Sequence, residues 1–323
     1  MSQDIYLGFD LGGTKMLSAV LDHDFNILNR QKKATDGSKK EIKLFEDMVQ
    51  LMQLALDESG IDRNNLKGIG VGSPGPLDPF AGVILNTPNL GFKNFPMKQK
   101  LEDIFGVAVS IDNDVNAGIY GEFKFGAGRG FKHVVGISPG TGVGGCVILD
   151  SQLFRGSNGT AGELGHWVIR TDSGNLGDLP YGTVEHLCSR TSIAKDLAHM
   201  AASGRAPTIF EGAGTDLKKI KSSLIAQAIA NGEKAVIDVV RRSAQNMGVA
   251  LANIVKAYDP ECIIIGGGLV PKIGKLYLEE AVQSMIKHAP CDAARKVIVK
   301  IGELGDDAAL KGSVALLRDG RKA

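Results

Sequence analysis

The first residues whose types and spacing could do chemistry are the run Asp-Leu-Gly-Gly-Thr-Lys from Asp10 to Lys15. Two adjacent glycines let backbone N–H groups approach phosphate oxygens, because no Cβ stands in the way. The hydroxyl of Thr14 can donate to the same phosphate, and Asp10 can hold Mg²⁺, which prefers oxygen ligands. We therefore predict a phosphate and magnesium site in this run, with a plain hairpin turn as the alternative.

A second glycine-rich run, Gly-Thr-Gly-Val-Gly-Gly, extends from Gly140 to Gly145 and matches the dinucleotide fingerprint G-x-G-x-x-G. That fingerprint needs a helix after it, whereas the residues 146–149 that follow are apolar and typical of a strand. We therefore reject a dinucleotide-binding fold and predict a second hairpin that cradles phosphate. A Walker A loop is excluded too, because no Gly-Lys-Ser/Thr follows at the required spacing.

A cluster of acids and amides, Asp112-Asn113-Asp114 with Asn116, stands where a strand gives way to a helix. A carboxylate at a helix start is often only a cap. Phosphoryl transfer to a hydroxyl, however, needs a base that accepts the hydroxyl proton. Asp114, beside the hydrogen-bonding Asn113, is the best candidate for that base.

Two further segments could recognise ligands. Glu163, His166 and Glu185 offer two carboxylates and an imidazole that, with an amide, would serve several sugar hydroxyls, although a single histidine is often only a packing residue. The apolar run 263–265 leads into Gly266-Gly267-Gly268, which could form a flat platform for adenine or only a strand-to-helix turn.

The elements that must position these residues follow a pattern of strands and then helices that occurs twice. A chain of 323 residues favours two lobes. We expect a smaller α/β lobe at 1–116 plus 306–323, and a larger one at 117–305. The predicted strands are 5–9, 16–21, 25–30, 68–71, 83–85, 107–111, 134–137, 144–149, 152–154, 263–265 and 297–301; the predicted helices are 41–58, 97–105, 113–124, 184–203, 218–230, 233–257, 272–287 and 306–318.

Composition narrows the class of protein. The formal net charge is +1 with no long block of one sign, so the sequence predicts neither a nucleic-acid partner nor a membrane surface. It shows no signal peptide and no apolar run of about 20 residues. The four cysteines have no zinc or redox spacing, which favours unpaired thiols and a cytoplasmic location.

Together, and in this order, these segments resemble the ROK family of bacterial sugar kinases. The resemblance extends from Gly8 to about Leu317, and its other specific parts are the Ser-Pro-Gly-Pro run from Ser73 and the Ala-Gly-Glu-Leu-Gly-His run that ends at His166. It implies an α/β, two-lobed, actin-like ATPase (ribonuclease H-like) fold, with ATP and sugar in the cleft between the lobes.

The resemblance also implies a role for each matching residue. Asp114 would be the catalytic base, and a homodimer is expected. The sugar ligands would be Asn89, Asn113, Glu163, His166 and Glu185. The nucleotide, with Mg²⁺ at Asp10, would bind at Asp10, Gly12, Gly13, Thr14, Lys15, Gly140, Thr141, Gly142, Gly267 and Gly268.

One departure from the family concerns zinc. Members usually bind a structural zinc with the histidine and three cysteines that follow it, but here the cysteine positions hold Leu176, Asp178 and Thr183. A tetrahedral site needs four suitable ligands, so we predict no structural zinc. Zinc normally fixes the segment that presents Glu185 in the family. The resemblance therefore does not by itself predict where Glu185 lies in this chain.

The predicted function is ATP-dependent phosphorylation of a hexose, most simply glucose to glucose 6-phosphate. N-acetylmannosamine, fructose and allose are alternative substrates in relatives. A non-catalytic, sugar-responsive regulator of the same family is the alternative function. Repressors of the family carry a DNA-binding segment before the first hairpin, and only about four residues precede the first strand here.

Overall fold

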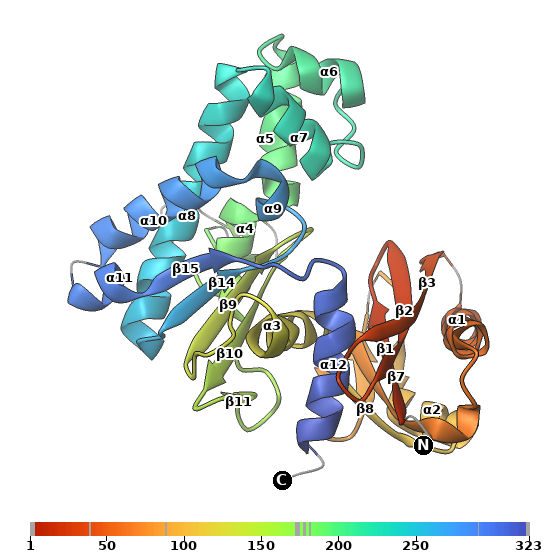
Figure 1. The fold of residues 1–323 in the computed structure, drawn as a ribbon. Coiled ribbons are helices and arrows are strands. Elements are labelled where there is room, and N and C mark those ends of the chain that lie inside the picture. The colour runs from red at the N-terminus through yellow and green to blue at the C-terminus, as the bar shows by residue number, and fades with distance from the viewer. Residues whose placement is uncertain are drawn as a thin grey trace. The chain divides into compact units, whose positions relative to one another are not determined.

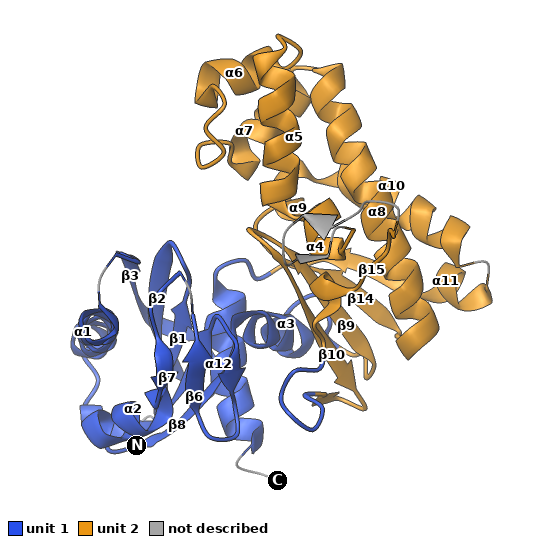
Figure 2. Cartoon of the chain, turned by 180° about the vertical axis from the view of Figure 1, so that it is seen from behind, with its two compact units in different colours: residues 1–129, 155–161, 304–323 blue, residues 130–154, 162–303 orange. Residues whose placement is uncertain are grey.

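The structure is a computed structural model that describes residues 4–38, 40–87, 89–171, 175–176, 179–180, 182–289 and 291–320. The chain forms two compact units, shown in Figure 2. Unit 1 comprises residues 1–129, 155–161 and 304–323, and unit 2 comprises residues 130–154 and 162–303. These limits differ from the expected boundary at 116, because the helix that begins at Asp114 packs on the C-terminal helix of unit 1.

The central sheet of unit 1 has the strand order β3-β2-β1-β4-β8. Its first two strands form the predicted glycine hairpin, in which Leu11 pairs with Met16. The parallel neighbours β1 and β4 are buried almost throughout, which explains their continuous apolar sequence. The strands are β1 (Ile5–Leu11), β2 (Lys15–Asp22), β3 (Ile27–Ala34), β4 (Leu66–Ser73) and β8 (Ala108–Asn113), with a small sheet of β5 (Leu77–Asp78), β6 (Val83–Asn86) and β7 (Lys93–Phe95).

The helices of unit 1 pack on this sheet, and glycines at the contacts of α12 allow the backbones to approach closely. A Cβ at Gly8, Gly70 or Gly312 would clash with backbone carbonyls across the contacts that α12 makes with β1, β4 and α3. Figure 1 shows α12 and α3 lying side by side. The helices are α1 (Glu41–Ser59), η1 (Arg63–Asn65), α2 (Met97–Phe105), α3 (Asp114–Phe125) and α12 (Asp307–Gly320).

The central sheet of unit 2 repeats the design of unit 1. Its order is β11-β10-β9-β14-β15, again a three-stranded antiparallel part followed by two parallel strands. Each sheet contains one of the two predicted glycine hairpins, between neighbouring antiparallel strands. The strands are β9 (Val134–Pro139), β10 (Val143–Leu149), β11 (Gln152–Leu153), β14 (Cys262–Ile265) and β15 (Ile298–Ile301), with a separate pair of β12 (Asn175–Leu176) and β13 (Leu179–Pro180).

The helices of unit 2 form a large buried cluster around α8, which packs along α10. Two helices that were predicted as continuous are each broken in two, at Ser189 and at Gly274. Ser189 caps the second helix by accepting from the N–H of Ser192, and Gly274 has a left-handed φ of 66°. The helices are η2 (Leu164–His166), α4 (Val184–Cys188), α5 (Arg190–Ala202), α6 (Pro207–Ala213), α7 (Ser222–Ala230), α8 (Lys234–Tyr258), α9 (Val270–Ile273), α10 (Lys275–His288) and α11 (Asp292–Lys296).

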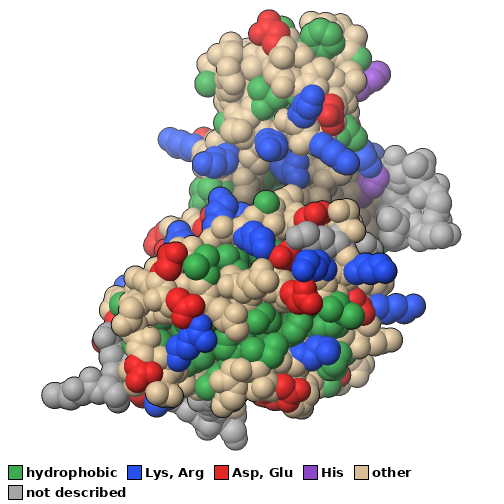
Figure 3. Space-filling view, turned by 90° about the vertical axis from the view of Figure 1, so that its right-hand side faces the viewer, with side chains coloured by type: hydrophobic (Ala, Val, Ile, Leu, Met, Phe, Trp, Pro, Cys, Tyr) green, Lys and Arg blue, Asp and Glu red, His purple; other side chains and the backbone are tan. Residues whose placement is uncertain are grey.

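Acidic and basic side chains are interspersed on the face shown in Figure 3, with hydrophobic side chains between them. In the part of the chain that the structure describes, no helix combines the length and the apolar character that a membrane crossing requires. The described cysteines Cys146, Cys188 and Cys262 are buried as thiols, and Cys291 is exposed.

Candidate active site

The glycine hairpin of unit 1 joins β1 to β2. The N–H of Gly12 donates to the carbonyl of Lys15 at 3.0 Å, and the hydroxyl of Thr35 donates to the carbonyl of Gly12 at 2.8 Å. A Cβ at Gly12 would lie 2.7 Å from the Lys15 oxygen, so the turn itself requires a glycine there. Gly13 is exposed and a Cβ there would meet nothing within 4 Å, so the protein's own packing does not explain this second glycine.

Asp10, at the end of β1, is the most perturbed carboxylate beside this hairpin. Burial, followed by the charge of Asp114, raises its pKa to about 7, and Asp306 adds to the effect while Lys15 opposes it. The Nζ of Lys15 lies 2.5 Å from a carboxylate oxygen of Asp306. A carboxylate that is destabilised by burial and by neighbouring acids is suited to a cation, so the residues present fit Mg²⁺ at Asp10.

The junction between β8 and α3 presents the predicted base. Asn113 caps α3, and its side-chain oxygen accepts from the N–H of Val115 at 2.9 Å and of Asn116 at 3.3 Å. Asp114 is the first residue of α3, and one of its carboxylate oxygens accepts from the N–H of Val115 at 3.0 Å. Asp114 is half-buried, and its Cα would lie 3.5 Å from a Cβ at Gly72, the residue of β4 that pairs with Asp10.

Asn89, the remaining predicted sugar ligand of unit 1, lies in the turn between β6 and β7 and is exposed. This turn is held by Thr87, whose carbonyl accepts from the N–H of Leu90 at 2.9 Å and of Gly91 at 2.8 Å. The carbonyl oxygen of Asn89 faces Gly37, where a Cβ would lie 2.5 Å away. The described contacts of Asn89 are therefore with the segment that follows β3.

The hairpin of unit 2 joins β9 to β10 as predicted. The N–H of Gly140 donates to the carbonyl of Gly142 at 2.8 Å, which closes the turn. Two residues at the start of α5 hold it from one side. Arg190 donates from its N–H to the Gly140 carbonyl at 2.9 Å and from its guanidinium to the Thr141 hydroxyl at 3.1 Å, and the Thr191 hydroxyl donates to the Thr141 carbonyl at 2.7 Å.

Glu185 lies directly against this hairpin. Its carboxylate accepts from the N–H of Val143 at 2.9 Å, and the glycine at position 142 leaves the room that the carboxylate occupies. Glu185 is in the first turn of α4, where Thr183 caps the helix by accepting from the N–H of His186 at 3.1 Å. The structure thus brings a predicted sugar ligand and the predicted second phosphate loop together.

Glu163 immediately precedes the short helix η2 and His166 is its last residue, and both are exposed. Their nearest charged atoms, His166 Nδ1 and Glu163 Oε2, are 3.9 Å apart. The segment lies tightly on β10, because a Cβ at Gly165 would clash with the carbonyl of Val143, and the left-handed Gly162 approaches the backbone of Gly145. Packing on β10 therefore presents both side chains to solvent.

The glycine bend after β14 lies beside the end of β9, where the hairpin between β9 and β10 begins. The N–H of Gly266 donates to the carbonyl of Ile137 at 2.8 Å. Gly267 has a φ of 75°, and a Cβ there would lie 2.6 Å from the Pro139 carbonyl. A Cβ at Gly268 meets nothing within 4 Å, so this exposed position is open to a ligand.

The predicted residues thus form two groups, one in each unit. Sequence reasoning missed three side chains that hold these groups: Arg155, which pairs with Asp112, and Arg190 and Thr191, which hold the second hairpin. Each pair is distant in the sequence, and no local motif marks it.

The expected absence of a structural zinc stays a prediction, because part of the segment that follows His166 lies outside the described residues. Among the residues described, no group of three or more His, Cys, Asp and Glu residues could hold a metal ion. His166 has Glu163 as its charged neighbour, and Thr183 is engaged as a helix cap. Asp178 lies outside the described residues, as does the side chain of Leu176.

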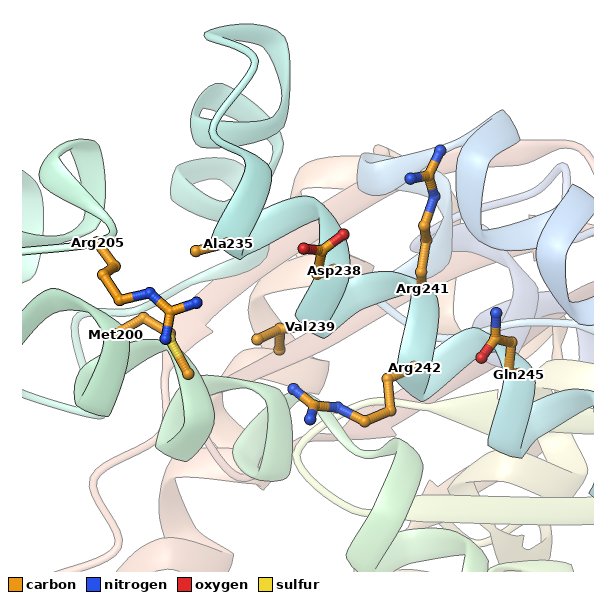
Figure 4. A pocket seen from close by; sticks show the side chains of 8 residues that line it. All are labelled: Met200, Arg205, Ala235, Asp238, Val239, Arg241, Arg242 and Gln245. Carbon is orange, nitrogen blue, oxygen red and sulfur yellow. The ribbon is translucent and has the colours of Figure 1, made fainter.

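A surface cavity of about 520 Å³ lies along α8 and contains none of the predicted site residues. Figure 4 shows Arg241 and Arg242, on neighbouring positions of α8, pointing in different directions. Arg241 lies 3.1 Å from a carboxylate oxygen of Glu280, and Arg242 lies 3.9 Å from one of Asp196. These arginines already face acids, so the cavity adds no group to the site.

Comparison with known proteins places these features in a family. The family model described as "ROK family" matches residues 6–320. The glucokinase of Halalkalibacterium halodurans is 31% identical over 324 residues, covering 98% of this chain and 96% of that protein. A putative xylose repressor of Caldicellulosiruptor is 26% identical over 315 residues, covering 97% of this chain and 78% of that protein.

Among solved structures, a ROK family glucokinase from Streptomyces griseus in complex with glucose and AMPPNP is 29% identical, with a TM-score of 0.84. The superposition covers 98% of this chain and all of that one. It confirms the predicted actin-like α/β fold, which the repeated sheet order of the two units also displays. The chain belongs to the ROK family.

Proposed function

We propose that this protein is a sugar kinase that transfers the γ-phosphoryl group of ATP to a hexose hydroxyl, with glucose as the first candidate. The observation that supports the proposal is the proximity of Asp114 to Asp10: Asp10 pairs with Gly72 between β1 and β4, and a Cβ at Gly72 would lie 3.5 Å from the Cα of Asp114. The pKa of Asp10, raised first by burial and then by the charge of Asp114, agrees with this proximity. It supports a base close to the predicted phosphate and magnesium hairpin. The glucokinase relatives support the reaction class.

In this mechanism Asp114 accepts the proton of the attacking sugar hydroxyl while the bond to phosphorus forms. Asp112 is not available as the base, because both of its carboxylate oxygens accept hydrogen bonds from Asn113, Asn116 and Arg155. Asn113, Glu163, His166 and Glu185 orient the sugar, with Asn89 as a further contact. Bound Mg²⁺ would supply charge neutralisation on the phosphates near Asp10.

Each hairpin offers N–H groups to the phosphates of the nucleotide. Gly12 and Gly140 close the turns with their own N–H groups. The N–H groups of Gly13 and Thr14, together with Lys15, would then bind phosphate oxygens at the first hairpin, and those of Thr141 and Gly142 would bind them at the second. Gly267 and Gly268 line the adenosine. The expectations that ATP and sugar bind between two lobes and that the protein is a homodimer stay predictions.

The test is an assay of ADP release with purified protein and a sugar panel. The panel contains glucose, fructose, allose and N-acetylmannosamine, and also N-acetylglucosamine, because a relative from Photobacterium profundum is an N-acetyl-D-glucosamine kinase. Asp114→Asn should lower turnover by about 10²–10⁴-fold, the usual contribution of a general base, while nucleotide affinity is retained. Near-normal turnover in this variant would rule out the base, and no sugar-dependent ADP release from the wild type would rule out the kinase.

A further inference from the structure

Arg155 makes the most buried arginine–carboxylate contact among the described ion pairs of unit 1. Its Nε and Nη2 lie 2.8 and 2.7 Å from the same oxygen, Oδ2, of Asp112. The Asp112 side chain is 5% exposed and that of Arg155 is 27% exposed, so the pair is largely shielded from water. Two donors on one oxygen hold the carboxylate in a fixed orientation.

The other oxygen of Asp112 extends this contact to the start of α3. Oδ1 accepts from the N–H of Asn113 at 2.8 Å and from the side-chain amide of Asn116, also at 2.8 Å. These two residues stand on either side of Asp114 in the sequence. The carboxylate of Asp112 therefore ties Arg155 to the turn from which Asp114 projects.

The segment that carries Arg155 makes two defined contacts in unit 1. The N–H of Ala161 donates to the carbonyl of Arg155 at 3.1 Å, which closes the segment 155–161 into a compact loop. Gly159 has a φ of 74° and approaches Pro79 so closely that a Cβ would lie 2.9 Å from the ring. Arg155 thus reaches Asp112 from a loop that is closed by its own backbone and lies against Pro79.

We propose that Arg155 is a positioning residue for the base Asp114, acting through Asp112. The inference rests on the proposed kinase function. Without Arg155, a buried carboxylate would lose its cationic partner, a costly state that it escapes by rotating toward water. That rotation alters the hydrogen bonds to Asn113 and Asn116. A shift of about 1 Å in a reacting group can cost about 10²-fold in rate.

The experiment compares Arg155→Met, Asp112→Asn, the double variant and Arg155→Lys in a steady-state kinase assay at saturating sugar and ATP. Arg63→Met is the matched control, because Arg63 forms an exposed pair with Asp57 in the same unit. Nucleotide affinity is measured separately by titration, and folding is verified by circular dichroism at the assay temperature.

Arg155→Met should lower kcat by about 10²-fold and leave the nucleotide dissociation constant unchanged. Arg155→Lys should recover part of kcat, since it restores the charge without the two-donor geometry. In the Asp112→Asn background, Arg155→Met should cost far less, because no buried charge remains to be paired. Arg63→Met should behave as the wild type.

Two results would overturn the inference. One is a folded Arg155→Met protein with wild-type kcat, and the other is a loss from Arg155→Met that is equally large with and without Asp112→Asn. If Arg155→Met does not fold, Asp112→Asn and the double variant decide, since they should have similar kcat. A wild type that is inactive on every sugar overturns the proposed function and this inference with it, whereas an active wild type with an insensitive Arg155 overturns the inference alone.

Discussion

Replacing Asp10 by asparagine should stabilise the ligand-free protein at neutral and alkaline pH, while impairing nucleotide binding. In the folded protein the pKa of Asp10 is raised from 3.8 to about 7, first by burial and then by the charge of Asp114. The folded state therefore binds a proton more tightly than the unfolded state does. As pH rises from about 4 to 7, the wild type loses folding free energy that the asparagine variant keeps.

The magnitude follows from the size of the pKa shift. A difference of about 3 pKa units corresponds to about 4 kcal/mol. Because part of the Asp10 side chain reaches solvent, we expect about 2 kcal/mol of this to appear as a stability gain at pH 8. For a unit of this size, each kcal/mol moves the melting temperature by about 2–4 °C. The variant should therefore melt about 4–8 °C higher at pH 8, and much closer to the wild type at pH 5.

The assay is thermal unfolding in the presence of EDTA, without nucleotide, at several pH values from 5 to 8. Asp103→Asn is the control, since Asp103 is an exposed acid on α2 of the same unit. The melting temperature of Asp103→Asn should differ from that of the wild type by the same amount at every pH. If the difference in melting temperature between Asp10→Asn and the wild type were also constant from pH 5 to 8, Asp10 would not be held at an energetic cost in the ligand-free protein.

Three further predictions concern unit 2. Gly165→Ala places a Cβ against the carbonyl of Val143, and overpacking of about 1–3 kcal/mol should lower the melting temperature by several degrees. Gly268→Ala is the control and should keep the wild-type melting temperature, because a Cβ there meets nothing within 4 Å. Equal melting temperatures of the two variants would contradict the packing of Gly165 on β10. Glu185→Gln should raise the sugar KM by about 10–100-fold through loss of a charged hydrogen bond, measured by steady-state kinetics, and an unchanged KM would remove Glu185 from the sugar site. Arg190→Met should weaken nucleotide binding by about tenfold in calorimetric titration, because a donor to the second hairpin is lost, and unaltered affinity would count against that role.

Much of the fold could be predicted from the sequence because its signals are local. The helix expected at 97–105 is α2 with the same bounds, since apolar spacing marks its body and Gly106 ends it in a left-handed conformation. The third strand begins at Ile27 and not at Phe25, because Phe25 has a φ of 64° in a turn that Asp22 closes through Asn26. The helix α6 was not predicted, because its seven residues are too few to show a periodic pattern.

The candidate site could be predicted only where its residues are consecutive. The hairpin at Gly12 and the cap at Asn113 are motifs of adjacent residues, and the structure contains both. The contacts that hold them are long-range. Arg155 meets Asp112, and Arg190 meets the second hairpin, across tens of residues with no periodic or motif signal. Such pairs arise when elements pack, so a single sequence does not reveal them.

The position of Glu185 is held by contacts of the helix that presents it. Thr183, at the third position where the family resemblance implies a zinc-binding cysteine, caps this helix with its hydroxyl. Thr183 also forms a β-bridge with Val168, which joins the start of that helix to the segment after His166. The N–H of Val143 then fixes the carboxylate itself. If these contacts hold Glu185, Thr183→Ala should raise the sugar KM and lower the melting temperature together, because an N-cap contributes about 1 kcal/mol. Thr160→Ala, at an exposed position outside this helix, is the control and should behave as the wild type. A Thr183→Ala protein with the wild-type KM and melting temperature would refute the role of the cap.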